Sequence, residues 1–299
     1  MSFSSDIKNE LGKQISNARH CQLAELSAIY DFCGTFEQKT LEKGCFFLNC
    51  ENDIVAKKSF TLLKKAFNIY SSDENESDKL SKCEDYSHIL IEGHEALIIH
   101  EALNSFIVTQ KSCCRRAYLR GACLCGGSVS DPEKSYHFEI VCKSEDLANK
   151  IKNLLNTFDV DAKVTVRNKS HVLYIKESSQ IVDTLNIIEA PVALMEFENA
   201  IILKDMRNSI NRRNNCDTAN ISKTVSAAVK QIEAIQGIID TEEFKKLPDT
   251  VKEIARLRLD YPEASLKELG EYLDPPLGKS GVNHRLRKLS ELAEKLGKW

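Results

Sequence analysis

The sequence carries one short pattern twice, about ninety residues apart. Residues 26–34 read LSAIYDFCG, and residues 119–127 read LRGACLCGG. Each run combines apolar and small residues and ends in glycine, which is typical of a closely packed helix that stops at a sharp change of chain direction. Each run is followed by segments that look like paired strands. Two copies of one unit in one chain predict a domain with pseudo-twofold symmetry.

The hydrophobic periodicity predicts a similar order of elements after both runs, and therefore an α+β fold. In the first copy we expect helices at 20–33, 52–68 and 94–104 and strands at 35–41, 44–50 and near 86–92. In the second copy we expect helices at 111–126, 144–158 and 178–188, a hairpin over 127–142, and strands at 160–167 and 171–176. The acidic stretch 72–85 has no counterpart in the second copy, and we interpret it as an inserted, solvated loop.

The chain has 299 residues, enough for one large and one small domain that each bury a core. No apolar run approaches the roughly 20 residues that cross a bilayer, and residues 1–17 lack the apolar stretch of a secretory signal. The eleven cysteines follow no regular spacing. We therefore expect a cytoplasmic protein whose thiols are reduced.

The net charge of −3 is unevenly distributed along the chain. Residues 71–101 hold nine acids and two bases, whereas residues 204–230 hold six bases and two acids. The overall charge argues against nucleic acid as a partner, but a locally basic segment is compatible with it.

Between 192 and 237 the sequence predicts two helices separated by a polar segment. Residues 211–220, NRRNNCDTAN, show no apolar period and are predicted to form a linker or an extended arm. As an arm, the segment would contact phosphates and a DNA groove through Arg212, Arg213, Asn214, Asn215 and Asn220. As a linker, it would only connect two domains.

Residues 248–299 are predicted to contain three further helices. Ser265 and Glu268 form the sequence signature of a capping box at the start of a short middle helix. Ser280 is expected to cap the last helix, whose inner face we predict to be Val282, Leu286, Leu289, Ala293 and Leu296. Two short helices joined by a tight break, the second with a basic outer face, predict a helix-turn-helix.

The predicted DNA contacts lie on the N-terminal half of this last helix and its flanks: Lys279, Ser280, Asn283, His284, Arg285, Arg287 and Lys288. In the major groove, arginine can bind guanine and asparagine can bind adenine through paired hydrogen bonds. Lys279, Arg285 and Lys288 are better placed for phosphates, which position a protein without reading sequence. The alternative is a plain three-helix bundle whose basic side chains are only solvated.

At this point the residues resemble a known family. Residues 119–129, LRGACLCGGSV, are similar to the motif of the LAGLIDADG homing endonucleases. Together with residues 212–220 and the helix-turn-helix, nearly the whole chain resembles the WhiA family of bacterial regulators. The resemblance implies a pseudo-twofold αββαββα repeat and an all-α DNA-binding domain, with these boundaries: a degenerate LAGLIDADG-like domain over 1–204 in halves of 1–107 and 108–204, a linker or arm over 205–219, and a helix-turn-helix domain over 220–299.

In the nucleases, each motif helix ends in a carboxylate that holds Mg²⁺ at the twofold axis. The corresponding positions here are Cys33 and Gly126. A hard divalent ion needs oxygen ligands, which neither residue supplies. Asp31 lies two residues earlier, about 200° around the helix, and is expected to point away from the axis. The resemblance therefore implies a scaffold that has lost its catalytic metal, and we expect no metal and no cofactor.

Four other cysteines raise the question of a different metal site. Cys123 and Cys125 lie two residues apart on a helix and therefore point in different directions. Cys113 and Cys114 are neighbours, no CxxC pair is present, and the seven histidines show no HExxH spacing. We therefore interpret these cysteines as buried structural thiols. The arginines of the basic run 111–120 extend a DNA surface, contact a partner or are solvated at a helix end.

Three function classes follow from these observations. The first, implied by the resemblance, is a sequence-specific DNA-binding transcriptional regulator for sporulation, cell division and chromosome segregation, without nuclease activity. The second is a Mg²⁺-dependent DNA endonuclease with carboxylates elsewhere, and the third is a cell-division interaction hub with incidental DNA binding. We expect double-stranded promoter DNA as the main partner, a regulatory protein as a second partner, no membrane, a monomer in solution, and association with the nucleoid.

Overall fold

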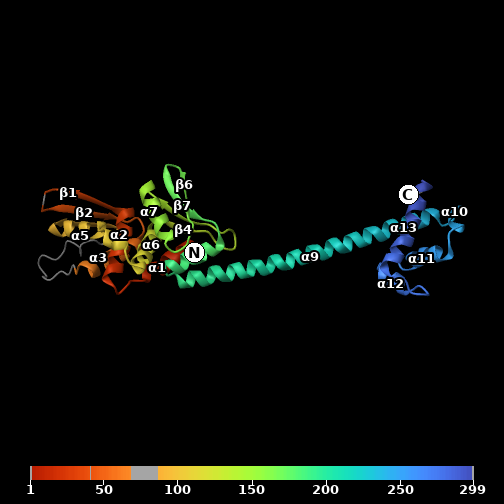
Figure 1. Ribbon diagram of the computed structural model, residues 1–299. Helices are drawn as coiled ribbons and strands as arrows, with labels where there is room; N and C mark the ends of the chain where they lie inside the picture. Colours follow the sequence, from red (N-terminus) through yellow and green to blue (C-terminus); the bar gives the residue numbers. More distant parts are fainter. Residues whose placement is uncertain (1, 41, 69–86, 298–299) are drawn as a thin grey trace. The chain divides into compact units, whose positions relative to one another are not determined.

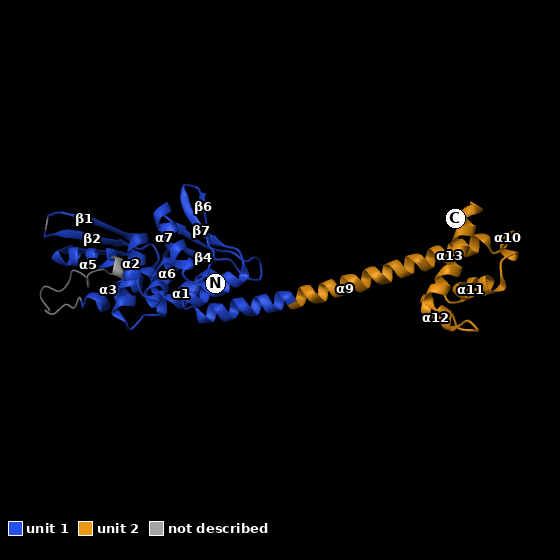
Figure 2. Cartoon of the chain, viewed as in Figure 1, with its two compact units in different colours: residues 1–205 blue, residues 206–299 orange. Residues whose placement is uncertain are grey.

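The computed structural model describes residues 2–40, 42–68 and 87–297. The chain divides into two compact units, residues 1–205 and residues 206–299 (Figure 2). The predicted acidic insertion at 72–85 lies outside the described residues. Among the residues that the structure describes, no helix combines the length and the apolar character that crossing a bilayer requires.

Two helices from the repeated pattern form the centre of the first unit. These motif helices, α2 (Arg19–Cys33) and α6 (Ser112–Gly126), pack against each other (Figure 1). Gly121 allows this close approach, because a Cβ at its position would lie 2.6 Å from the carbonyl oxygen of Glu25. The pairing of α2 with α6 is the pseudo-twofold arrangement that the sequence predicts.

The first copy places a three-stranded antiparallel sheet after α2. Its strands lie in the order β1-β2-β3, with Phe36 opposite Phe46 and Phe46 opposite Ile91. Ile89 and Ile91 on β3 are buried while the residues between and beside them are exposed, so one face of the sheet packs on the core. The elements of this copy are β1 (Gly34–Gln38), β2 (Gly44–Asn49), α3 (Asp53–Phe67), β3 (His88–Gly93) and α5 (His94–Asn104).

The second copy repeats the plan with a four-stranded antiparallel sheet in the order β4-β5-β7-β6. Ser144 caps the helix of this copy by accepting a hydrogen bond from the Leu147 amide at 3.2 Å. The mixed α+β fold is therefore confirmed. The elements are η1 (Phe106–Thr109), β4 (Gly127–Val129), β5 (Phe138–Cys142), α7 (Glu145–Asn156), β6 (Lys163–Arg167), β7 (Ser170–Ile175) and α8 (Ser178–Ile187).

A helix that the sequence did not predict precedes both copies. This helix, α1 (Phe3–Lys13), is capped by Ser2 and buries Ile7 and Leu11 in the core of the first unit. Residues 1–17 alternate charged and apolar side chains without a long apolar run, so their helical period is easily overlooked. Burial of the apolar stripe against α3 and α6 stabilises this helix.

The interface between the motif helices contains a buried ion network. The Glu25 carboxylate on α2 accepts hydrogen bonds from Arg120 of α6 at 3.0 and 3.1 Å and pairs with Lys58 of α3. The Lys58 ammonium also donates to the Leu11 carbonyl at 2.5 Å, and the Arg120 guanidinium to Glu189 at 2.5 Å. Two cations thus hold one buried carboxylate, which links α1, α2, α3 and α6.

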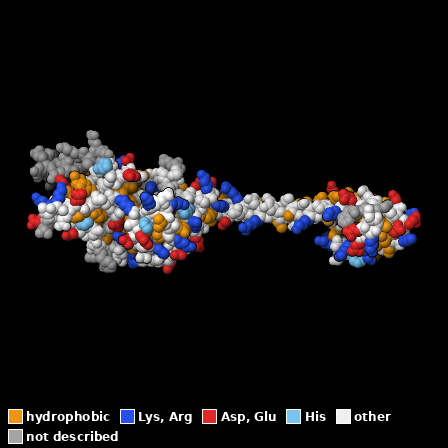
Figure 3. Space-filling view, turned by 90° about the horizontal axis from the view of Figure 1, so that it is seen from above, with side chains coloured by type: hydrophobic (Ala, Val, Ile, Leu, Met, Phe, Trp, Pro, Cys, Tyr) orange, Lys and Arg blue, Asp and Glu red, His pale blue; other side chains and the backbone are white. Residues whose placement is uncertain are grey.

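The structure corrects the prediction of an extended arm at 211–220. One helix, α9 (Pro191–Ile238), runs through this segment without a break and has residues in both units. Residues 211–220 contain neither glycine nor proline, and all of them are exposed. An exposed helix needs no apolar period, so the missing period did not mark a helix end. Lys and Arg as well as hydrophobic side chains reach the exposed surface of α9 (Figure 3).

The second unit is all helical after α9. Its core gathers Ile235 of α9 with Phe244, Ile254, Leu269 and Leu286 from the four helices that follow. These helices are α10 (Glu242–Lys245), α11 (Asp249–Asp260), α12 (Leu266–Glu271) and α13 (Lys279–Lys295). The three predicted C-terminal helices are therefore present.

Candidate nucleic-acid interface

A capping box fixes the start of α12, and a glycine allows the tight turn between α12 and α13. The Ser265 hydroxyl accepts a hydrogen bond from the Glu268 amide, and the Glu268 carboxylate accepts one from the Ser265 amide. A Cβ on Gly270 would lie 2.0 Å from the carbonyl oxygen of Leu277. The Leu277 amide donates to the Gly270 carbonyl at 2.9 Å. These contacts make the tight break that a helix-turn-helix needs.

One side of helix α13 is buried in the core of the second unit, and the opposite side is exposed. Val282, Leu286, Leu289 and Ala293 are buried as predicted, and Leu296 packs partly buried against the same core. The N-cap is Gly278, with no side-chain cap, so the prediction that Ser280 caps this helix is wrong. Ser280 instead lies within the first turn and is exposed. Its hydroxyl therefore belongs to the outer surface of α13.

The exposed face of α13 carries the predicted contact residues. Asn283 and His284 are exposed on its N-terminal half. Arg287 is also exposed, and its Nε donates to Glu291 Oε1 at 3.0 Å, one helical turn further along. The remaining exposed members of the predicted set are Lys279, Ser280 and Lys288.

Arg285 differs from its neighbours. It is half-buried, and its Nη1 donates to the carbonyl oxygen of Thr250 in α11 at 3.1 Å. The guanidinium therefore ties α13 to the first turn of α11. This contact gives Arg285 a structural role, which the charge pattern alone did not indicate.

The five predicted arm residues lie on the surface of α9. All are exposed, but successive helical positions are rotated by about 100°, so Arg212, Arg213 and Asn214 point in different directions, and only Asn215 lies beside Arg212. Arg213 and Asn220, seven residues apart, share one face. The helix therefore does not present these side chains together to one groove, as an extended arm would.

The arginines of the basic run 111–120 are engaged within the first unit. Arg116 donates to the carbonyl oxygens of Ile187 and Asn186 at 3.2 and 3.0 Å, which ties α6 to α8. Arg120 is buried in the ion network with Glu25. These contacts account for both side chains without a DNA contact.

Cys33 and Gly126, the positions that the resemblance to the nucleases aligned with metal ligands, offer no carboxylate, and the end of α6 has no room for one. A Cβ on Gly126 would lie 2.6 Å from the ring of Phe32 and 2.7 Å from the Val141 carbonyl oxygen. At the matching end of α2, hydrogen bonds from Cys125 and Cys50 lower the pKa of the Cys33 thiol. A thiol is a poor ligand for a hard ion such as Mg²⁺.

Asp31, which we expected to point away from the axis between the motif helices, contacts the second copy. Its carboxylate accepts a hydrogen bond from the Tyr118 hydroxyl of α6 and pairs with the Lys150 ammonium of α7 at 2.7 Å. Both partners belong to the second copy. The carboxylate is therefore used to join the copies, where Lys150 balances its charge.

Two family models match this chain. The WhiA LAGLIDADG-like domain matches residues 115–207, and the WhiA C-terminal HTH domain matches residues 210–293. A relative from Lachnoclostridium phytofermentans, named "Probable cell division protein WhiA", is 49% identical and aligns over 99% of both chains. The chain belongs to the WhiA family. A second relative with this name, from Alkaliphilus oremlandii, is 46% identical over 99% of this chain and 98% of its own.

A solved WhiA structure has the same fold. The crystal structure of full-length DUF199/WhiA from Thermatoga maritima aligns over 99% of both chains with a TM-score of 0.60 and 24% sequence identity. In this WhiA-family chain, helices α11, α12 and most of α13 lie within the match to the HTH domain. The motif helix α6 lies largely within the match to the LAGLIDADG-like domain.

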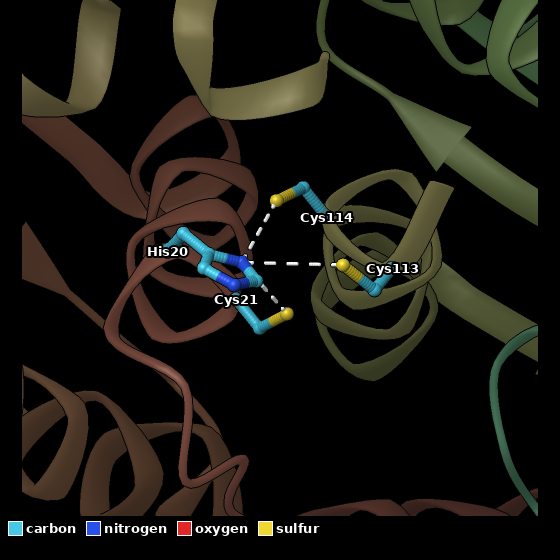
Figure 4. A group of neighbouring side chains, drawn as sticks. All are labelled: His20, Cys21, Cys113 and Cys114. Carbon is cyan, nitrogen blue, oxygen red and sulfur yellow. Dashed lines mark hydrogen bonds between the residues drawn. The ribbon is translucent and has the colours of Figure 1, made fainter. Parts of the chain in front are cut away.

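The structure also brings together side chains that the sequence analysis did not connect. In this member of the WhiA family, His20 and Cys21 at the start of α2 face Cys113 and Cys114 at the start of α6 (Figure 4). Cys114 is buried as predicted, but Cys113 is exposed. A signal was present: the 93-residue offset that superimposes the two motifs also superimposes His20-Cys21 on Cys113-Cys114.

Proposed function

We propose that this chain is a sequence-specific DNA-binding transcriptional regulator that does not cut DNA. The observation that carries this proposal is the outer face of α13. Exposed Asn283, His284 and Arg287 stand on the N-terminal half of a helix that the capping box and Gly270 hold in helix-turn-helix geometry. Residues at this place in a recognition helix reach base edges when the helix enters the major groove.

Basic residues on the flanks of α13 contact the phosphates of the DNA backbone. Lys279 at the start of α13 and Lys288 further along are exposed cations. Phosphate contacts supply affinity and position without sequence information. The partner that fits this surface is double-stranded promoter DNA, bound by a protein that is monomeric in solution and associates with the nucleoid.

The C-terminal ends of the motif helices support a protein that does not cut DNA. Gly126 has no room for a side chain, Cys33 offers sulfur, and Asp31 is paired with Lys150. A Mg²⁺-dependent nuclease needs carboxylates that converge on the ion. The first unit therefore acts as a scaffold and as the surface for a regulatory protein partner.

The cellular role we propose is regulation of cell division, because the similar proteins carry the name of a cell division protein. Sporulation and chromosome segregation belong to the same proposal, since they are implied by the family resemblance. Chromosome-bound regulators of this kind act through the promoters that they occupy.

The test begins with selection of bound duplexes from a random DNA library by the full-length protein. Binding of the selected duplex and of a scrambled duplex is then measured by fluorescence anisotropy at one salt concentration. We expect Arg287→Ala to weaken binding of the selected duplex by about 1–3 kcal/mol while binding of the scrambled duplex changes little. Lys279→Ala should weaken both duplexes alike.

Equal affinity of wild type and Arg287→Ala for the selected duplex would contradict the assignment of α13 as the reading helix. Incubation of supercoiled plasmid with the protein and Mg²⁺ tests the second part of the proposal. We expect the plasmid to stay intact. Nicking that stops when a chelator is added would restore the endonuclease alternative.

A further inference from the structure

Two pairs of ligand-type side chains meet where the motif helices begin. His20 Nδ1 lies 3.2 Å from the Sγ atoms of Cys21 and Cys114 and 4.0 Å from that of Cys113 (Figure 4). One nitrogen and three sulfur atoms all lie within 4.8 Å of one another. His20 and Cys21 come from α2, and Cys113 and Cys114 come from α6.

These separations are close to the edge lengths of the ligand tetrahedron around a zinc ion. Bonds of about 2.3 Å to sulfur and about 2.0–2.1 Å to nitrogen place ligand atoms about 3.6–3.8 Å apart around tetrahedral Zn²⁺. The observed distances from His20 Nδ1 lie on both sides of this range. Small rotations of the side chains are enough to reach it, because His20 and Cys113 are exposed and free to adjust.

We propose that His20, Cys21, Cys113 and Cys114 bind one Zn²⁺ ion that clamps the motif helices together at their N-terminal ends. Three thiolates and one imidazole form a complete Cys₃His set, the composition of a closed structural zinc site rather than a catalytic one. Binding displaces the protons of the thiols that are protonated in the metal-free protein.

The site is distinct from that of the homing endonucleases. The 93-residue offset places His20 on Cys113, Cys21 on Cys114, and Cys33 on Gly126. The former nuclease position Cys33 lies thirteen residues after His20, which is about 20 Å along a helix that rises 1.5 Å per residue. The two ends of the helix pair also differ in chemistry, because sulfur ligands select soft or borderline ions over Mg²⁺.

The surroundings suit a metal–thiolate centre. Cys21 and Cys114 pack with Ala18, Ala24 and Ala117 in a small apolar cluster, which excludes water from the inner side. All four side chains lie in the first turn of their helices, and burial raises the pKa of the Cys21 and Cys114 thiols, so these groups give up their protons when the ion binds. The exposed outer side, made by His20 and Cys113, gives the ion a path of entry.

The test uses the full-length protein purified under reducing conditions without chelators. We expect about one zinc ion per chain by elemental mass spectrometry. After exchange with Co²⁺, we expect the visible absorption of tetrahedral cobalt and the near-ultraviolet charge-transfer bands of cobalt thiolate. Cys113→Ser and His20→Ala change exposed side chains, so both variants should fold. Each should lose zinc affinity, measured against a chelating dye, by more than the roughly 10–100-fold that the loss of an outer-shell partner costs.

Cys216→Ser is the matched control, because Cys216 is an exposed cysteine on α9 outside this group. It should leave zinc content and cobalt spectra unchanged. Purified protein with no bound zinc and no cobalt bands would overturn the proposal. Cobalt bands that are the same in wild type and Cys113→Ser would also overturn it, as would a disulfide among these cysteines in protein kept under reducing conditions.

Discussion

Glycine at position 126 allows the end of α6 to pack closely against its neighbours. In this chain its missing side chain leaves room for the Phe32 ring and the Val141 carbonyl oxygen, which would lie 2.6 and 2.7 Å from a Cβ. A carboxylate side chain at this position would therefore displace the neighbours before it could bind an ion. The end of α6 is packed as part of the core.

This packing predicts the effect of a very small change. Gly126→Ala should lower the free energy of unfolding by about 1–3 kcal/mol, because the added methyl group overfills a packed interface. Urea titration followed by circular dichroism measures the change. The matched control is Gly278→Ala, where a Cβ meets nothing within 4 Å. Equal stability of the two variants would contradict the packing described here.

His100 is a second residue whose environment makes a prediction. Its Nδ1 lies 3.0 Å from the Tyr30 hydroxyl, and its ring stacks on Phe36 with centroids 3.9 Å apart. Burial lowers the pKa of His100 from its ordinary value near 6.5, while Glu101 acts in the opposite direction with a smaller effect. The folded protein therefore favours the neutral ring, whose Nδ1 can accept the hydrogen bond from Tyr30.

The sign of the pH effect follows from this preference. Because the unfolded chain takes up the proton more readily, the stabilisation is complete above about pH 6.5 and is lost as the pH falls through the folded-state pKa. Urea titrations at pH 7 and pH 5 should show a larger loss of stability for wild type than for His100→Gln, which does not titrate. Equal losses would mean that protonation of His100 does not oppose folding.

At the scale of elements, the two motif helices are joined at several levels along their length. The ligand-type side chains lie at their N-terminal ends, the Glu25–Arg120 pair lies further along both helices, and Asp31 near the C-terminal end of α2 contacts Tyr118 in the middle of α6. These polar groups of the interface are paired with each other.

The buried carboxylate in this interface should be indispensable. Glu25→Gln removes the charge that balances Arg120 and Lys58, and breaking such a buried pair costs about 3–5 kcal/mol. Glu271→Gln is the control, because Glu271 pairs with Lys267 on the surface at 3.7 Å and such pairs contribute about 0–1 kcal/mol. Chemical denaturation of both variants should show a loss several times larger for Glu25→Gln. Similar losses would contradict the conclusion that the buried network stabilises the fold more than a surface ion pair does.

Most elements of the first unit were predictable because they have strong local signals, whereas α1 was missed because its apolar period is short. An alternating or a helical spacing of apolar residues marks most of them in the sequence. Boundary residues such as Ser144 and Gly34 are of types that favour helix caps or turns. In the second unit, the capping-box residues Ser265 and Glu268 likewise predicted the start of α12. The segment 211–220 had no such signal, because an exposed helix without breakers looks like a polar linker in sequence.

At the scale of the whole molecule, sequence reasoning was weakest where distant segments meet. The group of His20, Cys21, Cys113 and Cys114 exists only because α2 and α6 pair, and neither half alone has the spacing of a metal site. Similarly, the basic character of Arg285 suggested a DNA contact, but its partner Thr250 lies on another helix. Charge and spacing in the sequence indicate candidate binding residues, whereas tertiary contacts determine which of these side chains can bind a ligand or DNA.

The two units divide the proposed function between them. The first unit contains the match to the WhiA LAGLIDADG-like domain, and the second carries the exposed face of α13. Both belong to one chain joined through α9. The account therefore predicts that the first unit contributes no cutting, while sequence recognition depends on a few side chains near residues 283–287.

The most direct measurement is a genome-wide occupancy map of the tagged full-length protein, compared with the same protein carrying Asn283→Ala and Arg287→Ala. Both side chains are exposed, so the double variant should fold and accumulate as wild type does. We expect wild type to be concentrated at discrete promoter segments that share a sequence, and the variant to lose this pattern. Occupancy of the same segments by the variant at the same level would contradict it.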